Sequence, residues 1–502
     1  MKDVILMSSK PNILWFVADQ MRCDSMAHMG NPAASTPNLD ALAEEGVTFE
    51  NAYCQNPVCV PSRCSFLTGL YPHTLGHRTM HFMMRQEDPN IMKTMKANGY
   101  EVVWIGRNDF IPSSWKKTDY CDKFFDGTDL VEKSAVEGSA FHPGQRGDVQ
   151  PEIVPVMQDA ERKYSFYLGK FPEHSLDHTF DWNCVNAALN YLDERSKQPD
   201  AKPFFLYCTL SFPHPPYGCE EPWYSLIDRS KIPPRRPNLE TLEGKAAILK
   251  GIRAKQGLQN WTEEQYNELR AVYLGMVARF DHQLGLLLNK LKEIGEYDNT
   301  GVFVFSDHGD LTGDYGITEK CQNSFEDPLT NVPLVVKPAA GATVHTGHNK
   351  ALVQLNDLPA TVYEMTGVTP DYIQFGKSLC ETLATGGTHR DAVFCEGGRL
   401  KGEVQAMEPE HGPQSTYWPR ISTQHESDEA HTKGCMVRMG NLKYIMRLYE
   451  SDQLYDLEKD PQELKNCIDD PAYTDTLGEM RQRMLRFYME TADFVPTKMD
   501  KR

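Results

Sequence analysis

The chain has 502 residues, with 52 Lys or Arg and 70 Asp or Glu, so its formal net charge at neutral pH is −18. That acidity argues against broad electrostatic binding to nucleic acid or to anionic membranes, although a local cluster of cations could still hold a small anion. Apolar residues make up 40% of the chain and charged residues 24%, which indicates a globular protein of roughly two to four domains.

No window approaches the roughly 18 apolar residues of a membrane span, and 1–10 has no extended apolar core of the secretory-signal kind. We therefore expect a cytoplasmic protein without a membrane partner, or a periplasmic one if a signal has been removed. The 13 cysteines are an odd number scattered along the chain. This pattern favours free, mostly buried thiols over a disulfide framework.

Apolar runs alternate with amphipathic stretches over the first three quarters of the chain. Thr36-Pro37 marks the start of a helix that stops at Gly46. Strands separated by helices predict βαβ units, and so a large, mixed, mostly parallel sheet sandwiched by helices. The predicted strands are 12–18, 101–106, 203–210, 301–306 and 332–336, and further helices are predicted over 62–70 and 262–294.

The composition changes after about residue 385. Residues 401–434 are polar and predict a long loop, whereas 435–439 and 443–448 flank Gly440-Asn441 and predict a hairpin. A further strand is predicted over 454–457 and a closing helix over 473–488. We therefore predict a large α/β domain over 1–385 and a smaller α+β domain with an antiparallel sheet over 386–502.

Two predicted strands end in residues that can bind a cation. Asp19-Gln20 follows the first strand, and Asp307-His308 follows 301–306. Ligands gather beyond the carboxyl ends of strands in open α/β sheets, so the two pairs could converge on one ion. Carboxylate and amide oxygens suit Ca²⁺ or Mg²⁺. Taken singly, each pair also fits a plain turn or cap.

A third motif, Cys59-Val60-Pro61-Ser62-Arg63, opens a predicted helix. The free N–H groups of a helix N-terminus and the Arg63 guanidinium suit an anion. Cys54, Cys59 and Cys64 are spaced five apart, which matches neither the common zinc patterns nor the iron–sulfur patterns. A cysteine nucleophile and three buried structural thiols both remain open from these residues alone.

With its continuation Phe66–His73 (FLTGLYPH), this motif closely resembles the signature of the formylglycine-dependent, type I sulfatases of the alkaline-phosphatase superfamily. The resemblance extends along most of the chain. The other matching segments are 12–19 (first strand and metal ligand), 306–310 (second metal motif), 212–217 (PHxPY loop), Lys320 (downstream lysine), 353–367 and 454–461.

The resemblance implies an alkaline-phosphatase-like fold and a sulfuric ester hydrolase whose first domain is catalytic. Cys59 would be oxidised to a formylglycine aldehyde by a separate partner, a formylglycine-generating or anaerobic sulfatase-maturating enzyme. One hydroxyl of the aldehyde hydrate would attack sulfur, and the other would then lose its proton and expel sulfate. A divalent cation would lower the pKa of the attacking hydroxyl.

The same resemblance assigns further site residues. The cation would be Ca²⁺, with Mg²⁺ or Mn²⁺ as alternatives, and its ligands would be Asp19, Gln20, Cys59, Asp307 and His308. Arg63 would hold the aldehyde hydrate. Lys320 and His214 would contact the sulfate and the leaving oxygen, with His214 as a candidate general acid.

Two departures from the family pattern matter. Asp19-Gln20 stands where two carboxylates are common, and we associate this pair with the phosphonate monoester hydrolase branch. The family's GKxH motif is replaced by Gly106-Arg107-Asn108-Asp109. Arg107 can still bind an oxyanion, but the histidine that often serves as the base is missing. Asp109, His73 or His77 would have to replace it.

The predicted reaction is removal of O-sulfate from a small anionic substrate, such as a sulfated sugar released in glycosaminoglycan degradation. The candidate pocket residues are His77, Arg78, His81, Arg85, Arg399 and Lys401. One alternative is a phosphonate monoester or phosphodiester hydrolase that uses the same site. Another is a non-catalytic binder of sulfated ligands, which the intact CxPSR motif argues against. The sequence is also compatible with an oligomer.

Overall fold

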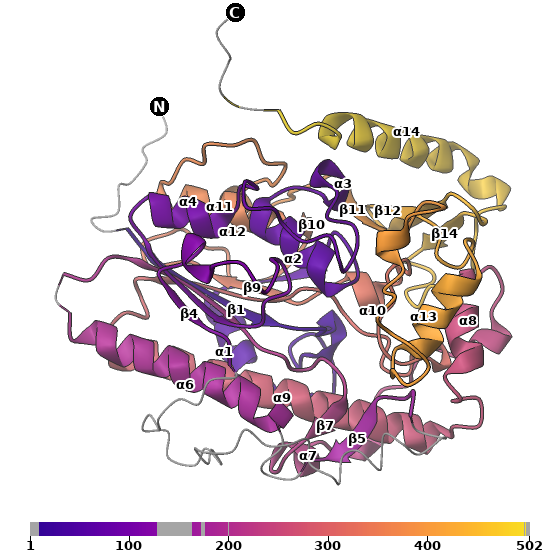
Figure 1. The fold of residues 1–502 in the computed structure, drawn as a ribbon, viewed down its shortest axis with the longest axis horizontal. Coiled ribbons are helices and arrows are strands. Elements are labelled where there is room, and N and C mark those ends of the chain that lie inside the picture. Colours follow the sequence, from indigo (N-terminus) through magenta and orange to yellow (C-terminus); the bar gives the residue numbers. More distant parts are fainter. Residues whose placement is uncertain (1–9, 128–162, 172–175, 199, 496, 498–502) are drawn as a thin grey trace, which may run out of the picture.

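The computed structural model describes residues 10–127, 163–171, 176–198, 200–495 and 497. Its centre is a sheet with helices on either side (Figure 1). The sheet has eight strands in the order β10-β2-β9-β8-β1-β6-β3-β4. The strands are β1 (Asn12–Ala18), β2 (Val47–Tyr53), β3 (Glu101–Gly106), β4 (Lys123–Phe125), β6 (Phe204–Thr209), β8 (Thr300–Ser306), β9 (Leu334–Lys337) and β10 (Gly347–Gln354). β9 runs antiparallel to β8 and β2, and the other pairs are parallel. This confirms the predicted mixed, mostly parallel α/β sheet.

Both faces of the sheet are buried, which explains why its central strands are apolar throughout. Along β1, Ile13, Trp15 and Val17 face one core, and Leu14 and Phe16 face the other. The Trp15 ring is surrounded by aromatic side chains of the neighbouring strands, mostly edge-on. A strand packed in this way has no polar face, so the continuous run NILWFVA is the sequence signature of its position.

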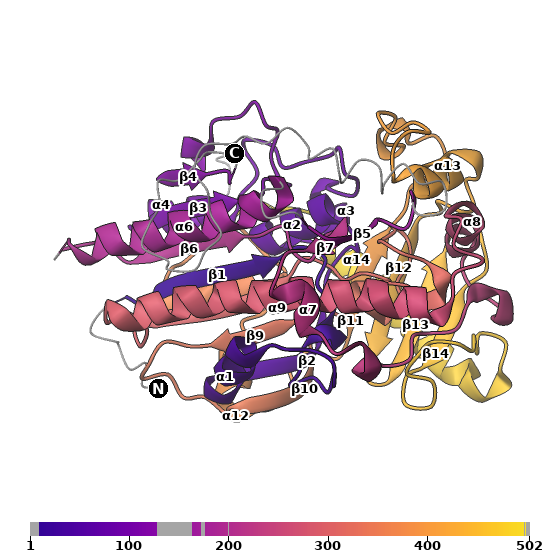
Figure 2. The same cartoon turned by 90° about the horizontal axis from the view of Figure 1, so that it is seen from below.

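Helices cover each face of the sheet. One face carries α2 (Cys59–Thr68), α4 (Ile91–Ala97), α11 (Asp357–Thr366) and α12 (Cys380–Thr385). The other carries α1 (Pro37–Glu45), α6 (Leu176–Ser196) and α9 (Glu263–Glu293), the last running along the sheet in Figure 2. α9 begins at a capping box of Thr262 and Gln265.

Shorter elements connect these layers. The helices are α3 (Pro72–Leu75), α7 (Trp223–Leu226), α8 (Ala247–Lys255) and α10 (Asp327–Thr330), and β5 (Tyr167–Lys170) pairs with β7 (Tyr217–Cys219). Single 3-10 turns occupy Cys23–Ser25, Lys117–Asp119, Arg229–Lys231, Leu239–Thr241, Asp314–Gly316, Val404–Ala406 and Pro471–Tyr473.

The start of α1 is capped by another helix. Thr36 and Pro37 occupy the predicted N-cap and first position, but the Thr36 side chain makes no capping hydrogen bond. Asp281 on α9 accepts hydrogen bonds instead, from the Leu39 amide (2.7 Å) and from the amide and side chain of Asn38 (3.2 and 2.8 Å). Burial raises the pKa of Asp281 to about 6.

Asp281→Ala should lower the free energy of unfolding by about 1–3 kcal/mol, because buried amide donors lose their acceptor. Urea denaturation measures this loss. The control is Asp193→Ala, which removes a partly exposed carboxylate that pairs α6 with Lys290 of α9 and should cost less than about 1 kcal/mol. Equal losses in the two variants would show that the Asp281 capping contact stabilises the fold no more than a surface ion pair does.

The same carboxylate predicts a pH dependence. Its folded pKa of about 6 lies above the ordinary value of 3.8, so ionisation is harder in the folded state. Relative to Asp281→Asn, the wild type should be most stable below pH 3.8 and should lose that advantage as the pH rises through 6. A difference that grows with pH would contradict this sign.

The C-terminal domain is an antiparallel sheet of β11 (Val393–Gly397), β12 (Gly434–Met439), β13 (Leu442–Arg447) and β14 (Gln453–Asp456), in that order. The predicted hairpin is confirmed, and its turn residue Gly440 has a φ of 54°. α14 (Thr474–Thr491) packs on one face. Met436, Ile445 and Tyr455 on the other face join the core that contains Trp15.

The prediction of a long loop over 401–434 is wrong in one part, because α13 (Trp418–Glu426) lies within it. Its sequence, WPRISTQHE, has few apolar residues, so no apolar stripe reveals it. α13 packs beside α8 (Figure 1), and the contact is close: a Cβ at Gly251 of α8 would lie 2.2 Å from Cγ2 of Thr423. Tertiary contacts with polar side chains therefore support this helix.

All 13 cysteines lie within the described residues and carry free thiols, 11 of them buried. This agrees with the predicted absence of a disulfide framework. Among the described helices, none combines the length and apolar content that crossing a bilayer requires.

Candidate active site

Four neighbouring parallel strands, in the order β8-β1-β6-β3, send the segments that follow them to the same edge of the sheet. Asp307 and His308 follow β8, and Asp19 follows β1. His214 lies after β6 and Arg107 directly after β3. This edge therefore gathers residues that are almost 300 positions apart, as expected for ligand sites in open α/β sheets.

A compact cluster forms where the N-terminus of α2 meets this edge. Asp19, Cys59, Asp307 and His308 are buried and place one ligand atom each within 4.8 Å of the others. The Cys59 Sγ atom lies 3.1 Å from His308 Nε2 and 3.7 Å from Asp19 Oδ1. The sequence prediction that the two strand ends converge is thus confirmed.

The cluster fits a divalent cation. The Nδ1 atom of His308 lies 2.9 Å from the Gly309 carbonyl oxygen, so the proton belongs on Nδ1 and the Nε2 lone pair faces Cys59. A metal-binding histidine is usually oriented by such a backbone hydrogen bond. Two carboxylates and this lone pair supply suitable donors.

Gln20 is placed in an unusual backbone conformation beside this cluster, with a φ of 69°. Its amide N–H donates to Asp307 Oδ1 (3.0 Å). The side-chain oxygen accepts from Lys320 Nζ (2.5 Å), and the side-chain nitrogen donates to Asp310 Oδ2 (2.5 Å). An amide oxygen has two lone pairs, so one remains for a cation, and Gln20 as a ligand stays a prediction.

Arg63 lies beneath the cluster and is completely buried. Its Nε donates to Asp307 Oδ2 (2.9 Å), its Nη2 to Asp19 Oδ2 (3.0 Å) and its Nη1 to Thr209 Oγ1 (2.8 Å). Nε and Nη2 thus hold the two carboxylates in place, and Nη1 is anchored to the Thr209 hydroxyl, where we predicted a contact with the aldehyde hydrate. α2 brings Arg63 here one turn after Cys59.

The electrostatics of the two central residues differ. Burial acts to raise the pKa of Asp19, but the cations around it, Arg107 foremost, hold that pKa well below its ordinary value. Burial and the Asp19 charge raise the pKa of the Cys59 thiol well above its ordinary value. The unmodified side chain is therefore a neutral thiol, which is a weak nucleophile.

Arg107 and Asp109, which replace the lysine and histidine of the family motif, also reach the site. Arg107 Nη1 lies 3.2 Å from Asp19 Oδ2, and Arg107 Nε lies 3.1 Å from Asp109 Oδ2. Asp109 is in addition 3.8 Å from Arg63 Nε. His73 and His77, the other candidates for the missing base, are paired elsewhere, with Glu396 (2.7 Å) and Asp88 (3.0 Å) respectively.

Lys320 and His214 form the other side of the site. Lys320 Nζ lies 3.0 Å from His214 Nε2, and since an ammonium can only donate, Nε2 accepts. The His214 Nδ1 atom lies 2.5 Å from the Pro215 carbonyl oxygen, which places its proton there. Burial and Lys320 hold the pKa of His214 well below its ordinary value. In this arrangement the Lys320 ammonium donates the hydrogen bond and His214 Nε2 accepts it.

Several residues that support the site were not among the predicted site residues. Asp310 accepts hydrogen bonds from Gln20 and from the Tyr217 hydroxyl (2.8 Å to Oδ2), and Tyr207 and Thr209 of β6 contact Arg63. Asp310 lies within the predicted metal motif and could have been found there. Tyr207 and Thr209 read as ordinary strand residues, because their role depends on which strand pairs with β1.

The predicted basic pocket is largely neutralised. Arg78 forms an ion pair with Glu403, His81 lies 2.9 Å from Glu410, and Arg399 lies 2.7 Å from Asp428; His77 is paired with Asp88, as above. The pairs of Arg78 and His81 join the segment after α3 to the segment before α13. They weaken the case for a strongly cationic subsite for a heavily sulfated chain.

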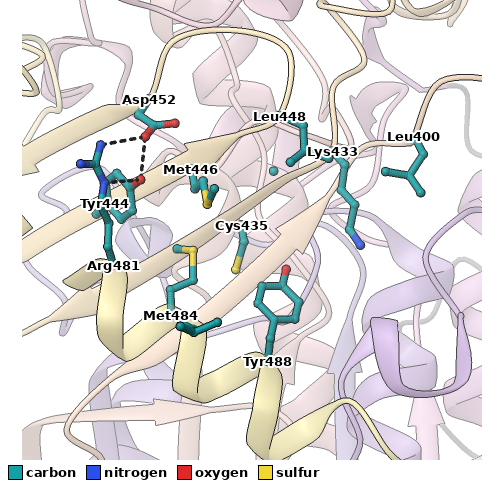
Figure 3. A pocket seen from close by; sticks show the side chains of 12 residues that line it. Leu400, Lys433, Cys435, Tyr444, Met446, Leu448, Asp452, Arg481, Met484 and Tyr488 are labelled. Atoms are coloured by element: carbon teal, nitrogen blue, oxygen red, sulfur yellow. Dashed lines mark hydrogen bonds and ion pairs between the residues drawn. The ribbon is translucent and has the colours of Figure 1, made fainter. Parts of the chain in front are cut away.

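A cavity of about 560 Å³ lies apart from this cluster, between α14 and the strands β12 and β13 (Figure 3). Met446, Leu448 and Met484 form apolar walls, and Arg481 and Asp452 lie 3.3 Å apart at one end. None of the predicted site residues lines this cavity, so we do not assign the chemistry to it.

Comparison with known proteins agrees with this geometry. A protein 26% identical over 97% of this chain and 96% of its own length is the multifunctional alkaline phosphatase superfamily protein PehA of Trinickia caryophylli. The N-acetylglucosamine-6-O-sulfatase of Bacteroides thetaiotaomicron is 23% identical over 95% of this chain and 86% of its own. The solved phosphonate monoester hydrolase of Agrobacterium radiobacter has the same fold, with a TM-score of 0.71, 22% identity and 96% coverage of both chains.

The match to a sulfatase family model over residues 11–368 identifies the chain as a hydrolase of the alkaline-phosphatase superfamily. Within it, the chain belongs to the sulfatase family, whose model is described as Sulfatase. It is a type I sulfatase and therefore a sulfuric ester hydrolase.

Proposed function

We propose that this enzyme removes O-sulfate from a small sulfated sugar, with residue 59 matured from cysteine to formylglycine. The observation that carries the proposal is the meeting of Cys59 with Asp19, Asp307 and His308 in one buried cluster. A relative that acts on N-acetylglucosamine 6-O-sulfate supports the sugar. The pairing of the nearby basic residues favours a mono- or disulfated substrate over a polysulfated one.

The proposed cation is Ca²⁺, held by Asp19, Gln20, Asp307, His308 and residue 59. When bound, it would polarise the sulfate and lower the pKa of the attacking hydroxyl. The nitrogen donor of His308 also suits Mn²⁺, because Ca²⁺ prefers oxygen ligands. Separate reconstitution of metal-free enzyme with each ion tests the choice.

The residues of this chain would divide the remaining work. Arg63 would hold Asp19 and Asp307 in register, and Arg107 and Lys320 would bind sulfate oxygens from two sides. Lys320 Nζ would donate to the leaving oxygen, while His214 would orient that ammonium through its Nε2 lone pair. We propose Asp109 as the base, since its carboxylate lies at the site beside Arg107.

A phosphonate monoester or phosphodiester is the second candidate substrate. Gln20 stands where a second carboxylate is common, which lowers the negative charge facing the substrate, and the relative PehA is described as multifunctional. Both esters carry one negative charge, as a sulfate ester does, so the same cations could bind them.

Matured enzyme should hydrolyse aryl sulfates and a 6-O-sulfated glucosamine more efficiently than phenyl phosphonate esters. Parallel kcat/KM measurements with each substrate, on protein co-expressed with a maturating enzyme, decide this. Mass spectrometry of the peptide that contains residue 59 controls for maturation. Dominant turnover of the phosphonate ester would replace the first candidate by the second, and tight binding of sulfated sugar without turnover would favour a binding protein.

A further inference from the structure

A chain of buried charges connects the C-terminal domain to Lys320. The Glu319 Oε1 atom lies 3.2 Å from Lys320 Nζ, and its Oε2 atom lies 3.7 Å from Nε of Arg420, in the first turn of α13. The two terminal nitrogens of Arg420 donate to both oxygens of Glu408, at 2.8 and 3.2 Å. All four side chains are at least nine-tenths buried, so water screens these charges little.

Glu319 is also part of a ring of contacts, in which hydrogen bonds are closed by its ion pair with Lys320. Its backbone N–H donates to the Tyr217 hydroxyl (3.0 Å), which donates to Asp310 (2.8 Å). Asp310 accepts from Gln20, and the Gln20 oxygen accepts from Lys320 (2.5 Å for both). Lys320 is thus held directly by Glu319, and Gln20 is held by Lys320 and Asp310.

Glu319 needs this support because its φ is 72°, a left-handed conformation that is costly for a residue other than glycine. A buried carboxylate paired with Lys320 alone would draw the ammonium toward itself and away from the substrate. Arg420 supplies a second cation on the far side of Glu319, so the negative charge is shared. The direction of Lys320 Nζ then depends on a residue of the C-terminal domain.

We propose that Arg420 is a positioning residue that sets Lys320 for proton donation to the leaving group, acting through Glu319 and held by Glu408. This inference rests on the proposed role of Lys320 in ester hydrolysis. It gives the C-terminal domain a part in the chemistry, and it explains why α13 forms in a polar segment with so little apolar surface.

The test is Arg420→Ala, measured on aryl sulfates whose leaving phenols range from strongly to weakly acidic. Poor leaving groups need the proton most. We expect kcat/KM to fall about ten- to hundredfold for the least acidic phenols, a range typical of supporting residues, and less than threefold for 4-nitrophenyl sulfate. Arg420→Lys should restore part of the loss, because a cation returns.

The matched control is Glu426→Gln, which breaks the α13 ion pair with Lys255, also between the two domains, without touching Glu319. It should leave the leaving-group dependence unchanged. If Arg420→Ala slows all substrates equally, or no more than Glu426→Gln does, the positioning role is refuted. Should Arg420→Ala not fold, Glu408→Gln takes its place, with the same steeper dependence expected at smaller amplitude.

The substrate preference of the wild-type enzyme tests the proposed function separately from the Arg420 result. If matured wild-type enzyme hydrolyses phosphonate esters instead of sulfates, the same series is made with aryl phosphonates, and the Arg420 prediction is unchanged. A steeper dependence there would support the positioning role although the proposed substrate is wrong. A flat one would overturn the positioning role alone.

Discussion

Cys59→Ala should lower kcat/KM of the matured enzyme for an aryl sulfate by at least ~10⁴-fold, a loss typical for removal of a nucleophile. The residue lies at the centre of the buried cluster, 3.1 Å from His308 Nε2, so another side chain cannot take its position. Initial-rate kinetics against the wild type, with residue 59 verified by mass spectrometry, measure the effect.

Cys59→Ser sharpens the same test. Serine offers one hydroxyl but not the two on one carbon that an aldehyde hydrate supplies, so we expect at most a single turnover. The matched control is Cys64→Ala, which removes another buried thiol of α2 that lies in the apolar core. It should cost stability through the small cavity it leaves while changing kcat less than about twofold. The wild-type protein, produced in the same way, must be fully matured for this comparison. Steady turnover by Cys59→Ser would then contradict the formylglycine proposal.

Arg63→Met should cost about 3–5 kcal/mol of unfolding free energy and more than ~100-fold in kcat/KM. The guanidinium lies 2.9–3.0 Å from carboxylate oxygens of both Asp307 and Asp19 and is completely buried. Without it, two buried carboxylates face each other. Added Ca²⁺ or Mn²⁺ should restore part of the stability, because a bound cation replaces the missing charge.

The comparison for Arg63 is Arg390→Met. The side chain of Arg390 is only 7% exposed, and its Nε lies 2.9 and 3.1 Å from the two oxygens of Asp357, at the start of α11, outside the cluster. The Arg390→Met variant should lose unfolding free energy to a similar extent, yet keep its kcat at temperatures where it is folded. Divalent cations should not restore its stability. If Arg63→Met behaves in the same way, Arg63 is a structural residue only.

A pH titration adds a second readout for Arg63. The low pKa of Asp19 means that its ionised form stabilises the folded state above the ordinary carboxyl pKa, and this contribution is lost as the pH falls. Removing Arg63 removes part of that contribution, so the stability of Arg63→Met should fall less steeply in acid. Urea midpoints across the acid range, compared with those of Arg390→Met, measure the change.

The central strands, and the convergence of the residues that follow two of them, could be predicted from local pattern, whereas the place of Cys59 in the cluster was implied by the family resemblance. A buried parallel strand is apolar on both faces, so the runs NILWFVA and GVFVFS are recognisable as strands in the sequence. The predicted ranges 12–18 and 301–306 agree with β1 and β8 to within one residue. Once these were predicted as strands of one parallel sheet, Asp19 and Asp307 had to emerge at the same edge. The helical start at Cys59 follows from Pro61 in the first turn.

Contacts between segments that are distant in the sequence could not be predicted from local pattern. β9 was expected only as a short strand, and its antiparallel direction depends on the path of the chain between β8 and β2. α13 was missed because its polar side chains are satisfied by partners such as Glu408, which no periodicity reveals. The basic residues Arg78 and His81 suggest an anion pocket in the sequence. In the fold they are paired with Glu403 and Glu410, which are more than 300 positions away.

The sequence by itself determined the family resemblance, and with it the expected class of chemistry, because the covalent order of Cys59, Pro61 and Arg63 and the residues at two strand ends are local features. Only the tertiary structure decided which charges meet: Arg63 with the carboxylates, His214 with Lys320, and Arg420 with Glu319. The energy of a buried charge depends on its nearest partners within a few ångströms, and the packing of the whole chain chooses those partners.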